Sequence, residues 1–330
     1  MVMMPGKPRS PVTTPLDRIA MPTWRAAFRV RVLGDRETRC GVRLRRRDAA
    51  QAALKKAFKM LLRTQFETEF PRCQRDLVDV PALQRSNVLA ISAGAVVSMT
   101  VDMVIRSSVG GVTVWDFDDV GVANLARSSY RFADVGRSKA KALAEHCRGI
   151  NPLARVTAIH GDLRKAPDAM IASVAARHDV VLVAPDDFAL HRRINRILIG
   201  LIPAVYTYVT NRGNTAEIVW TMPGQPGCIE CLLNAEERAA AGVAVDFQAL
   251  GVDVFRLALE AASVILGILL RGHQGGDLFE DMVDSSNRVI LLFSRKAGAL
   301  ADMLPREVVS GSSAIDIRQR RRPCPVCERK

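Results

Sequence analysis

From residue 87 onward, short apolar runs alternate with segments of helical periodicity. The mainly apolar runs have the length of buried strands and lie at residues 88–91, 112–117, 155–159 and 179–184. The segments between and after them have apolar side chains at helical spacing and lie at residues 98–107, 138–149, 167–177 and 188–202. Strands that alternate with helices in this way form a parallel sheet with helices on both faces. The pattern therefore predicts an α/β fold with a Rossmann-like, doubly wound, mostly parallel sheet.

The N-terminal part follows a different pattern. Residues 28–33 alternate apolar and basic side chains with the period of a strand, and residues 41–45 could return as a second strand. Asp48 stands where it would cap a helix over residues 49–64. We therefore predict a proline-containing flexible lead over residues 1–22, a small basic ββα domain over 23–85 and a larger domain over 86–330.

The turn after the first predicted strand has one feature of a dinucleotide fingerprint. That fingerprint would place glycines at positions 92, 94 and 97, but the sequence has Ser92, Gly94 and Val97. Asp116 ends the second predicted strand 22 residues after Gly94, where a carboxylate reaches a ribose hydroxyl in such folds. These residues predict a nucleotide-binding turn, with an ordinary strand-to-helix turn as the alternative.

Residues 114–140 carry a more specific pattern, VWDFDDVGVANLARSSYRFADVGRSKA. This segment resembles the ThiF/MoeB/HesA family, the bacterial relatives of ubiquitin-activating enzymes, in the stretch written D-x-D-x-V-x-x-x-N-L-x-R-Q and D-[IV]-G-x-x-K-A. The matching positions are Asp116, Asp118, Val120, Asn124, Leu125, Arg127, Asp134, Gly136, Lys139 and Ala140. Ser128 stands where the family has Gln.

Two later segments extend the resemblance. Residues 150–152 read I-N-P, as in the family. Residues 185–187 read P-D-D and are followed by Arg192 or Arg193 and by Asn195, which is similar to the family's T-D-N-x-x-x-R-x-x-x-N with Asp187 in place of Asn. The resemblance thus covers about residues 86–330.

The resemblance implies an enzyme that uses ATP and Mg²⁺ to adenylate a carboxylate, releasing pyrophosphate. Arg127 and Lys139 would neutralise the phosphates, and Asp186 would hold Mg²⁺, so these three residues form the expected catalytic set. The expected nucleotide-binding residues are Gly94, Asp116, Asp118 and Asn124. Its partner would be a ubiquitin-like or sulfur-carrier protein, or a ribosomally made peptide.

Four of the seven cysteines form two CxxC pairs separated by 92 residues. The pairs are Cys228 with Cys231 and Cys324 with Cys327. Two such pairs can supply four thiolates to one tetrahedral ion, which predicts a structural zinc site with no open position for water. A redox pair is the alternative. Similar pairs occur in the family, the second written C-P-x-C.

The sequence between Cys231 and Cys324 contains no cysteine. Family members that form a thioester or transfer sulfur use a cysteine in this region or in a crossover loop. The resemblance therefore implies a chain that stops at the acyl-adenylate.

Charge and composition restrict the partners and the location. The net charge is +13, and residues 1–85 contribute most of it. Such a basic segment could dock a client, and nucleic acid is not excluded.

The apolar stretch over residues 257–270 is too short to span a bilayer and contains Glu260, which predicts a buried helix. Without a secretory signal, we expect a cytoplasmic protein. We expect a homodimer, as in most of the family, or a heterodimer if the glycine turn is degenerate.

Three functions remain open from the sequence. Adenylation is the first. The second is a ThiF-like partner or scaffold subunit that binds protein but not ATP. This function is open because Ser92 and Ala95 add bulk near the phosphates, and Val97 adds a β-branched side chain where the helix and the strand approach closely. The third is a nicotinamide or flavin oxidoreductase, which would use Gly94 and Asp116 but give no reason for the zinc cysteines.

Overall fold

The computed structural model describes residues 40–210, 215–232, 249–292, 311–319 and 324–327. The chain divides into two compact units, Met1–Thr64 and Gln65–Lys330. Among the described residues, no helix combines the length and the apolar character needed to cross a bilayer.

The N-terminal prediction was wrong in one element. Residues 41–45, predicted as a strand, lie inside the long helix α1 (Cys40–Glu69), and so does Asp48, the predicted cap. The predicted helix over 49–64 lies within α1. Helix propensity explains the extension, because Arg and Leu between residues 43 and 47 are good helix formers. The predicted lead and first strand, residues 1–22 and 28–33, lie outside the described residues.

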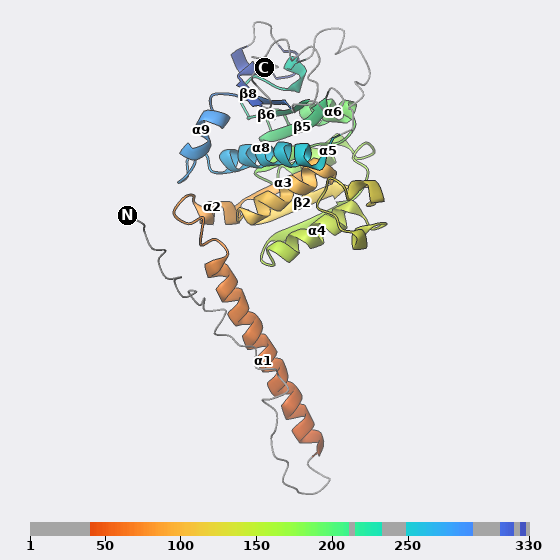
Figure 1. Ribbon diagram of the computed structural model, residues 1–330, viewed down its shortest axis with the longest axis vertical. Helices are drawn as coiled ribbons and strands as arrows, with labels where there is room; N and C mark the ends of the chain where they lie inside the picture. Colours follow the sequence, from red (N-terminus) through yellow and green to blue (C-terminus); the bar gives the residue numbers. More distant parts are fainter. Residues whose placement is uncertain (1–39, 211–214, 233–248, 293–310, 320–323, 328–330) are drawn as a thin grey trace, which may run out of the picture. The chain divides into compact units, whose positions relative to one another are not determined.

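The second unit contains the predicted sheet (Figure 1). Its eight described strands are β1 (Asn87–Ile91), β2 (Gly111–Asp116), β3 (Arg155–His160), β4 (Val180–Val183), β5 (Ala204–Thr210), β6 (Thr215–Thr221), β7 (Arg288–Leu292) and β8 (Gly311–Ile315). Their order is β3-β2-β1-β4-β5-β6-β7-β8. The strands β1 to β5 pair in parallel, whereas β6, β7 and β8 join antiparallel. The prediction of a mostly parallel, doubly wound sheet is confirmed.

Helices cover both faces of this sheet. They are α2 (Val80–Arg85), α3 (Ala95–Arg106), α4 (Lys139–Ile150), α5 (Asp168–Ala175), α6 (Phe188–Leu198), α8 (Gly251–Leu269) and α9 (Asp277–Val283), with short 3-10 turns η1 (Val122–Asn124), η2 (Phe132–Asp134), η4 (Ile229–Leu232) and η5 (Ile317–Gln319). The helices α3, α4 and α8 pack on one face and lie side by side in Figure 1, and α5 and α6 pack on the other. The late apolar stretch is thus a buried helix, α8, as predicted.

The central strand β1 shows how the core is divided. Val88 and Ala90 belong to the cluster under α3, α4 and α8, whereas Leu89 and Ile91 belong to the cluster under α5 and α6. All four are fully buried. A strand covered on both faces needs apolar side chains at every position, which explains the continuous run in the sequence.

Glycine at position 110 lets α2 approach the start of β2. A Cβ at Gly110 would lie 1.7 Å from the backbone oxygen of Gln84. Such an atom cannot be accommodated unless the backbone of one element moves. Gly149, near the end of α4, has no atom within 4 Å of an added Cβ and provides a matched comparison.

We predict that Gly110→Ala lowers the free energy of unfolding by about 3 kcal/mol, because α2 must separate from β2. Gly149→Ala raises it by about 0.5–1 kcal/mol, because alanine is the better helix former. Urea unfolding followed by circular dichroism measures both. Equal effects of the two substitutions would contradict the close approach at Gly110.

Candidate functional site

The predicted nucleotide residues meet at the carboxyl ends of β1 and β4. Of the predicted set, Gly94, Asn124, Arg127, Lys139 and Asp186 line one pocket of about 100 Å³, which we name the β1–β4 pocket. The strand order reverses between β1 and β4, and α/β sheets bind ligands at such a point. The structure therefore brings together residues spread over more than ninety positions of the sequence.

A larger cleft of about 610 Å³ lies elsewhere, between α3, α4 and the turn at residues 131–134. Its walls include Phe70, Arg106, Arg131 and His146. None of the residues predicted for catalysis or nucleotide binding lines it. Size alone therefore does not identify the candidate active site.

The turn between β1 and α3 departs from a glycine-rich loop in a specific way. Ser92 has φ = +81°, a left-handed conformation that favours glycine. Its hydroxyl compensates locally, because Oγ accepts a hydrogen bond from the Gly94 N–H at 3.2 Å. Gly94 is the N-cap of α3 and gives the helix no side-chain cap, and the pocket is lined by Gly94, Ala95 and Val96 at the start of this helix.

Val97 does not obstruct this turn. Its side chain is fully buried and belongs to the core cluster under α3 and α4. The valine at this glycine position of the fingerprint is thus accommodated in the core. Replacing it with glycine would leave a cavity.

Asp116, at the end of β2, fixes the turn. It is 5% exposed, and its carboxylate accepts hydrogen bonds from the N–H groups of Ala93 and Asp118, both at 2.6 Å. Burial raises the pKa of Asp116, while these hydrogen bonds and the charge of Lys139 oppose that rise. The carboxylate ties β2 to the β1–α3 turn. Of the predicted nucleotide-binding residues, Asp116 and Asp118 do not line the β1–β4 pocket.

Lys139 and Asp118 form an ion pair beside the pocket. The distance between Lys139 Nζ and Asp118 Oδ2 is 2.9 Å, with the side chains 12% and 44% exposed. Lys139 opens α4, so that its ammonium group lies at the pocket wall. The exposed carboxylate can rotate away and leave the ammonium group to an anionic ligand, because an ion pair of this exposure contributes little energy.

The chain segment from Gly121 to Arg127 carries the other cation. Asn124 ends η1, and its Oδ1 accepts a hydrogen bond from the Gly121 N–H at 2.8 Å. The Asn124 carbonyl accepts one from the Ser128 hydroxyl at 2.6 Å. Ser128, which replaces the family's Gln, therefore helps to hold this turn, and Arg127 projects from it to the pocket wall.

Asp186 follows β4, lines the pocket and is an exposed residue. Partial desolvation raises the pKa of the Asp186 carboxyl, and the charges of Lys139 and Arg127 lower it. The adjacent Asp187 caps α6 instead, accepting hydrogen bonds from the N–H groups of Ala189 and Leu190 at 2.9 and 3.2 Å. Asp186 thus lines the pocket, whereas Asp187 caps α6.

The arginine position of the T-D-N motif holds a histidine, and the structure shows the surroundings of this residue and of the arginine that follows it. In register, that position falls on His191, which is completely buried, and burial lowers its pKa to about 4. Arg192 instead forms a bidentate pair with Glu230 at 2.8 and 3.1 Å. In the sequence, the one signal for Glu230 is its position as an acidic residue inside a CxxC pair.

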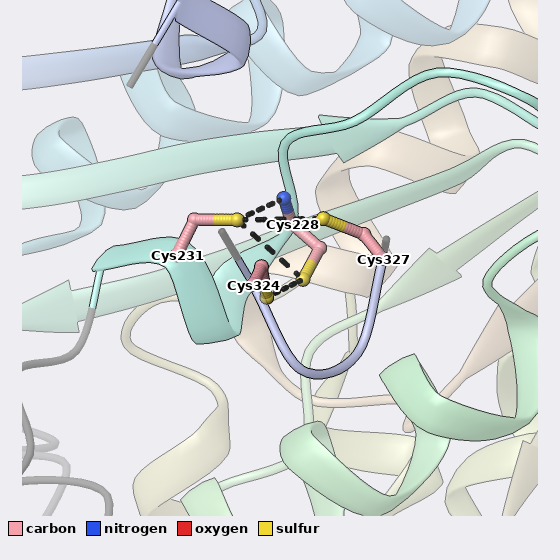
Figure 2. Close-up of side chains that lie close together, drawn as sticks. All are labelled: Cys228, Cys231, Cys324 and Cys327. Carbon is pink, nitrogen blue, oxygen red and sulfur yellow. Dashed lines mark hydrogen bonds between the residues drawn. The ribbon is translucent and has the colours of Figure 1, made fainter. Parts of the chain in front are cut away.

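The four cysteines of the two CxxC pairs converge in one place (Figure 2). Their sulfur atoms all lie within 4.8 Å of one another, with distances of 3.9, 3.9 and 3.6 Å for three of the pairs. A tetrahedral ion with Zn–S bonds of about 2.3 Å needs sulfur atoms about 3.8 Å apart. The cluster, which we name the four-cysteine site, therefore has the composition and the approximate dimensions of a four-thiolate zinc site.

Backbone donors face the sulfur atoms of the four-cysteine site. The Gly227 N–H donates to Cys327 Sγ at 3.3 Å, and the Cys228 N–H donates to Cys231 Sγ at 3.2 Å. Such donors stabilise thiolates. Neither CxxC pair is joined as a disulfide.

Comparison with known families gives one match over most of the chain. A sequence profile of the ThiF family matches residues 73–285. Molybdopterin-synthase adenylyltransferase of Escherichia coli K12 is 28% identical over 193 residues, which cover 56% of this chain and 75% of that protein. The sulfur carrier protein ThiS adenylyltransferase of the same organism is 28% identical over 187 residues, covering 56% and 73%.

A third relative matches a shorter part. The probable adenylyltransferase/sulfurtransferase MoeZ of Mycobacterium tuberculosis H37Rv is 33% identical over 141 residues, or 42% of this chain and 35% of MoeZ. The chain thus spans about a third of MoeZ.

Solved structures of E. coli MccB share the fold. The complex of this microcin C7 biosynthetic enzyme with N-formylated MccA superimposes with a TM-score of 0.57 at 17% sequence identity, covering 75% of this chain and 69% of MccB. The structure of MccB with ATP gives a TM-score of 0.56 at 16% identity. At this level of identity the likeness concerns the fold alone.

We predict that the purified chain binds one zinc ion, and that Cys324→Ser releases it and lowers the free energy of unfolding by several kilocalories per mole, because the site ties the two CxxC segments together. Metal analysis and thermal unfolding measure this. Cys73→Ser, at an exposed position, is the control and should change neither. A protein without bound metal and with four freely titratable thiols at these positions would contradict the prediction.

Proposed function

This chain belongs to the ThiF family, and from that premise we propose that it binds Mg-ATP and adenylates a carboxylate, releasing pyrophosphate. The convergence of Arg127, Lys139 and Asp186 on the β1–β4 pocket is the observation that carries the proposal. Two cations and one acid beside the N-terminus of α3 are the groups that a magnesium-bound polyphosphate needs.

In the proposed reaction, each residue at the β1–β4 pocket has a separate role. A carboxylate oxygen of the client attacks the α-phosphorus of ATP, the bond to the bridging oxygen breaks, and pyrophosphate leaves with the electron pair. Arg127 and Lys139 offset the charge that develops on the phosphate oxygens. Asp186 would hold Mg²⁺, which would offset the negative charge of the phosphates. Asp116 keeps the turn at Gly94 in place, and its carboxylate would accept a hydrogen bond from a ribose hydroxyl.

The client is proposed from the relatives. E. coli ThiS adenylyltransferase acts on a sulfur carrier protein, and MccB has been solved with the peptide MccA. We propose a sulfur-carrier or ubiquitin-like protein, or a ribosomally made peptide, as the client here, with residues 1–85 as its docking segment. We also propose that the reaction ends at the acyl-adenylate, since no cysteine lies between Cys231 and Cys324.

One observation favours the scaffold alternative. The Ser92 hydroxyl already accepts from the Gly94 N–H, a donor that a phosphate would otherwise receive. A chain with this turn could keep the ThiF fold and bind a protein partner without ATP. Nucleotide binding separates the two functions before any client is known.

We predict that the zinc-loaded chain binds ATP with Mg²⁺ and that Arg127→Ala, Lys139→Ala or Asp186→Ala each weakens transition-state stabilisation by about 3 kcal/mol, roughly a hundredfold in rate. Calorimetry with Mg-ATP measures binding, and pyrophosphate exchange in the presence of a client measures the rate. Lys141→Ala is the control, because Lys141 is exposed on the same helix as Lys139. Absence of saturable ATP binding by folded, zinc-loaded protein would leave only the scaffold function.

We also propose that two copies associate through the outer face of α8. Val252, Phe255 and Leu259 are exposed by 69%, 45% and 55% on this helix, and exposed apolar patches mark interaction sites. Most members of the family form two-fold dimers, which is why a second copy is the expected occupant.

The prediction is that Phe255→Glu converts the dimer to a monomer in light scattering at micromolar concentration, because a charge would be buried in the interface. Met170→Glu is the control, since Met170 is 47% exposed on α5, on the other side of the sheet. A wild-type chain that is monomeric under these conditions would exclude this interface.

A further inference from the structure

The helix α6 lies between the two candidate sites. At its N-terminus, Asp187 caps the helix and Asp186 lines the β1–β4 pocket. Further along, Arg192 and Arg196 both contact Glu230, which lies in η4 between Cys228 and Cys231. Because residues four apart lie on one face of a helix, α6 presents one face to the first CxxC segment.

The contact between α6 and this segment is a buried ion pair with a third charge at its edge. Glu230 is 1% exposed. Arg192 Nε and the second guanidinium nitrogen lie 2.8 and 3.1 Å from the two carboxylate oxygens, and Arg196 lies 2.9 Å from Oε1. A bidentate pair fixes the relative orientation of the two groups, and a buried carboxylate cannot exchange its partners for water.

A second buried polar residue lies on the same helix. Asn195 is fully buried, and its amide nitrogen and oxygen have no hydrogen-bond partner among the described residues. The helix that carries Asn195 contacts η4, which begins directly after Cys228. An amide N–H next to a metal-bound thiolate would be satisfied by the sulfur, and such outer contacts orient metal ligands.

We propose that Glu230 is a positioning residue through which the four-cysteine site holds α6, and with it Asp186, in the geometry that the β1–β4 pocket needs. This inference rests on the proposed function. A filled four-cysteine site keeps the CxxC segment folded, because the free energy of metal binding in such sites stabilises the folded chain. The ion pair then fixes the rotation of α6, a helix of eleven residues whose N-cap follows Asp186 directly. Zinc and Mg-ATP binding are therefore coupled, and the coupling is reciprocal.

The test compares full-length, zinc-loaded chains by calorimetry with Mg-ATP. Glu230→Gln keeps all four cysteines and should still bind one zinc ion, but its dissociation constant for Mg-ATP should rise about tenfold. Asp168→Asn is the matched control. Asp168, which is 65% exposed, pairs with Arg193 of α6. Because an exposed ion pair contributes little, the substitution should change the dissociation constant for Mg-ATP less than about twofold.

The reciprocal measurement reads the zinc instead of the nucleotide. In the wild type, saturating Mg-ATP should slow the loss of zinc to a chelator, and Glu230→Gln should abolish this protection. Should Glu230→Gln fail to fold, Arg192→Lys provides the milder variant. It keeps the charge but loses the bidentate fork, and we expect a severalfold weaker binding of Mg-ATP.

The possible outcomes separate the two proposals. Wild-type protein that binds Mg-ATP, together with folded variants at Glu230 or Arg192 that bind it equally well, would overturn the positioning role and leave the proposed function standing. Protection of zinc by Mg-ATP that persists in the variants would do the same. Zinc-loaded wild-type protein that binds no Mg-ATP would overturn both.

Discussion

Burial of β1 and β4 between two helix layers is the constraint on which the rest of the second unit depends. All four residues of β4 are fully buried, as are the last four of β1. Polar groups of this segment can therefore reach solvent or a ligand only at the strand ends. Parallel pairing brings the carboxyl ends of these strands to one edge, so Gly94 and Asp186, ninety-two positions apart, face the same pocket.

The charges at this edge are balanced among themselves. Asp118 neutralises Lys139, Asp116 is held by two backbone N–H groups, and the cations oppose the desolvation of Asp186. Such an arrangement lets the cationic groups lie ready beside the N-terminus of α3 without a large electrostatic cost in the free protein. In the proposed function, an incoming polyphosphate would compete with Asp118 for Lys139, and magnesium at Asp186 would offset the added negative charge.

The β1–α3 turn shows how a fold absorbs a departure from its sequence pattern. Ser92 keeps the left-handed backbone that glycine would adopt and compensates through its own hydroxyl, while Val97 fills space in the core under α3. The shape of the turn is therefore retained although two of the three glycine positions are changed. The effect of the substitutions falls on the donors available to a ligand and not on the path of the chain.

The sequence by itself determined the fold class, the order of elements from β1 to α6, the family motifs and the four cysteines, because these follow from local periodicity and spacing. It did not indicate α1 starting at Cys40, where helix propensity outweighed an alternating pattern, or the antiparallel strands β6 to β8, whose partners are far apart in sequence. Only the tertiary structure decided that Arg192 pairs with Glu230, that His191 is buried and that Val97 is a core residue. Those outcomes depend on which side chains from distant segments share one volume, and no spacing within a single segment contains that information.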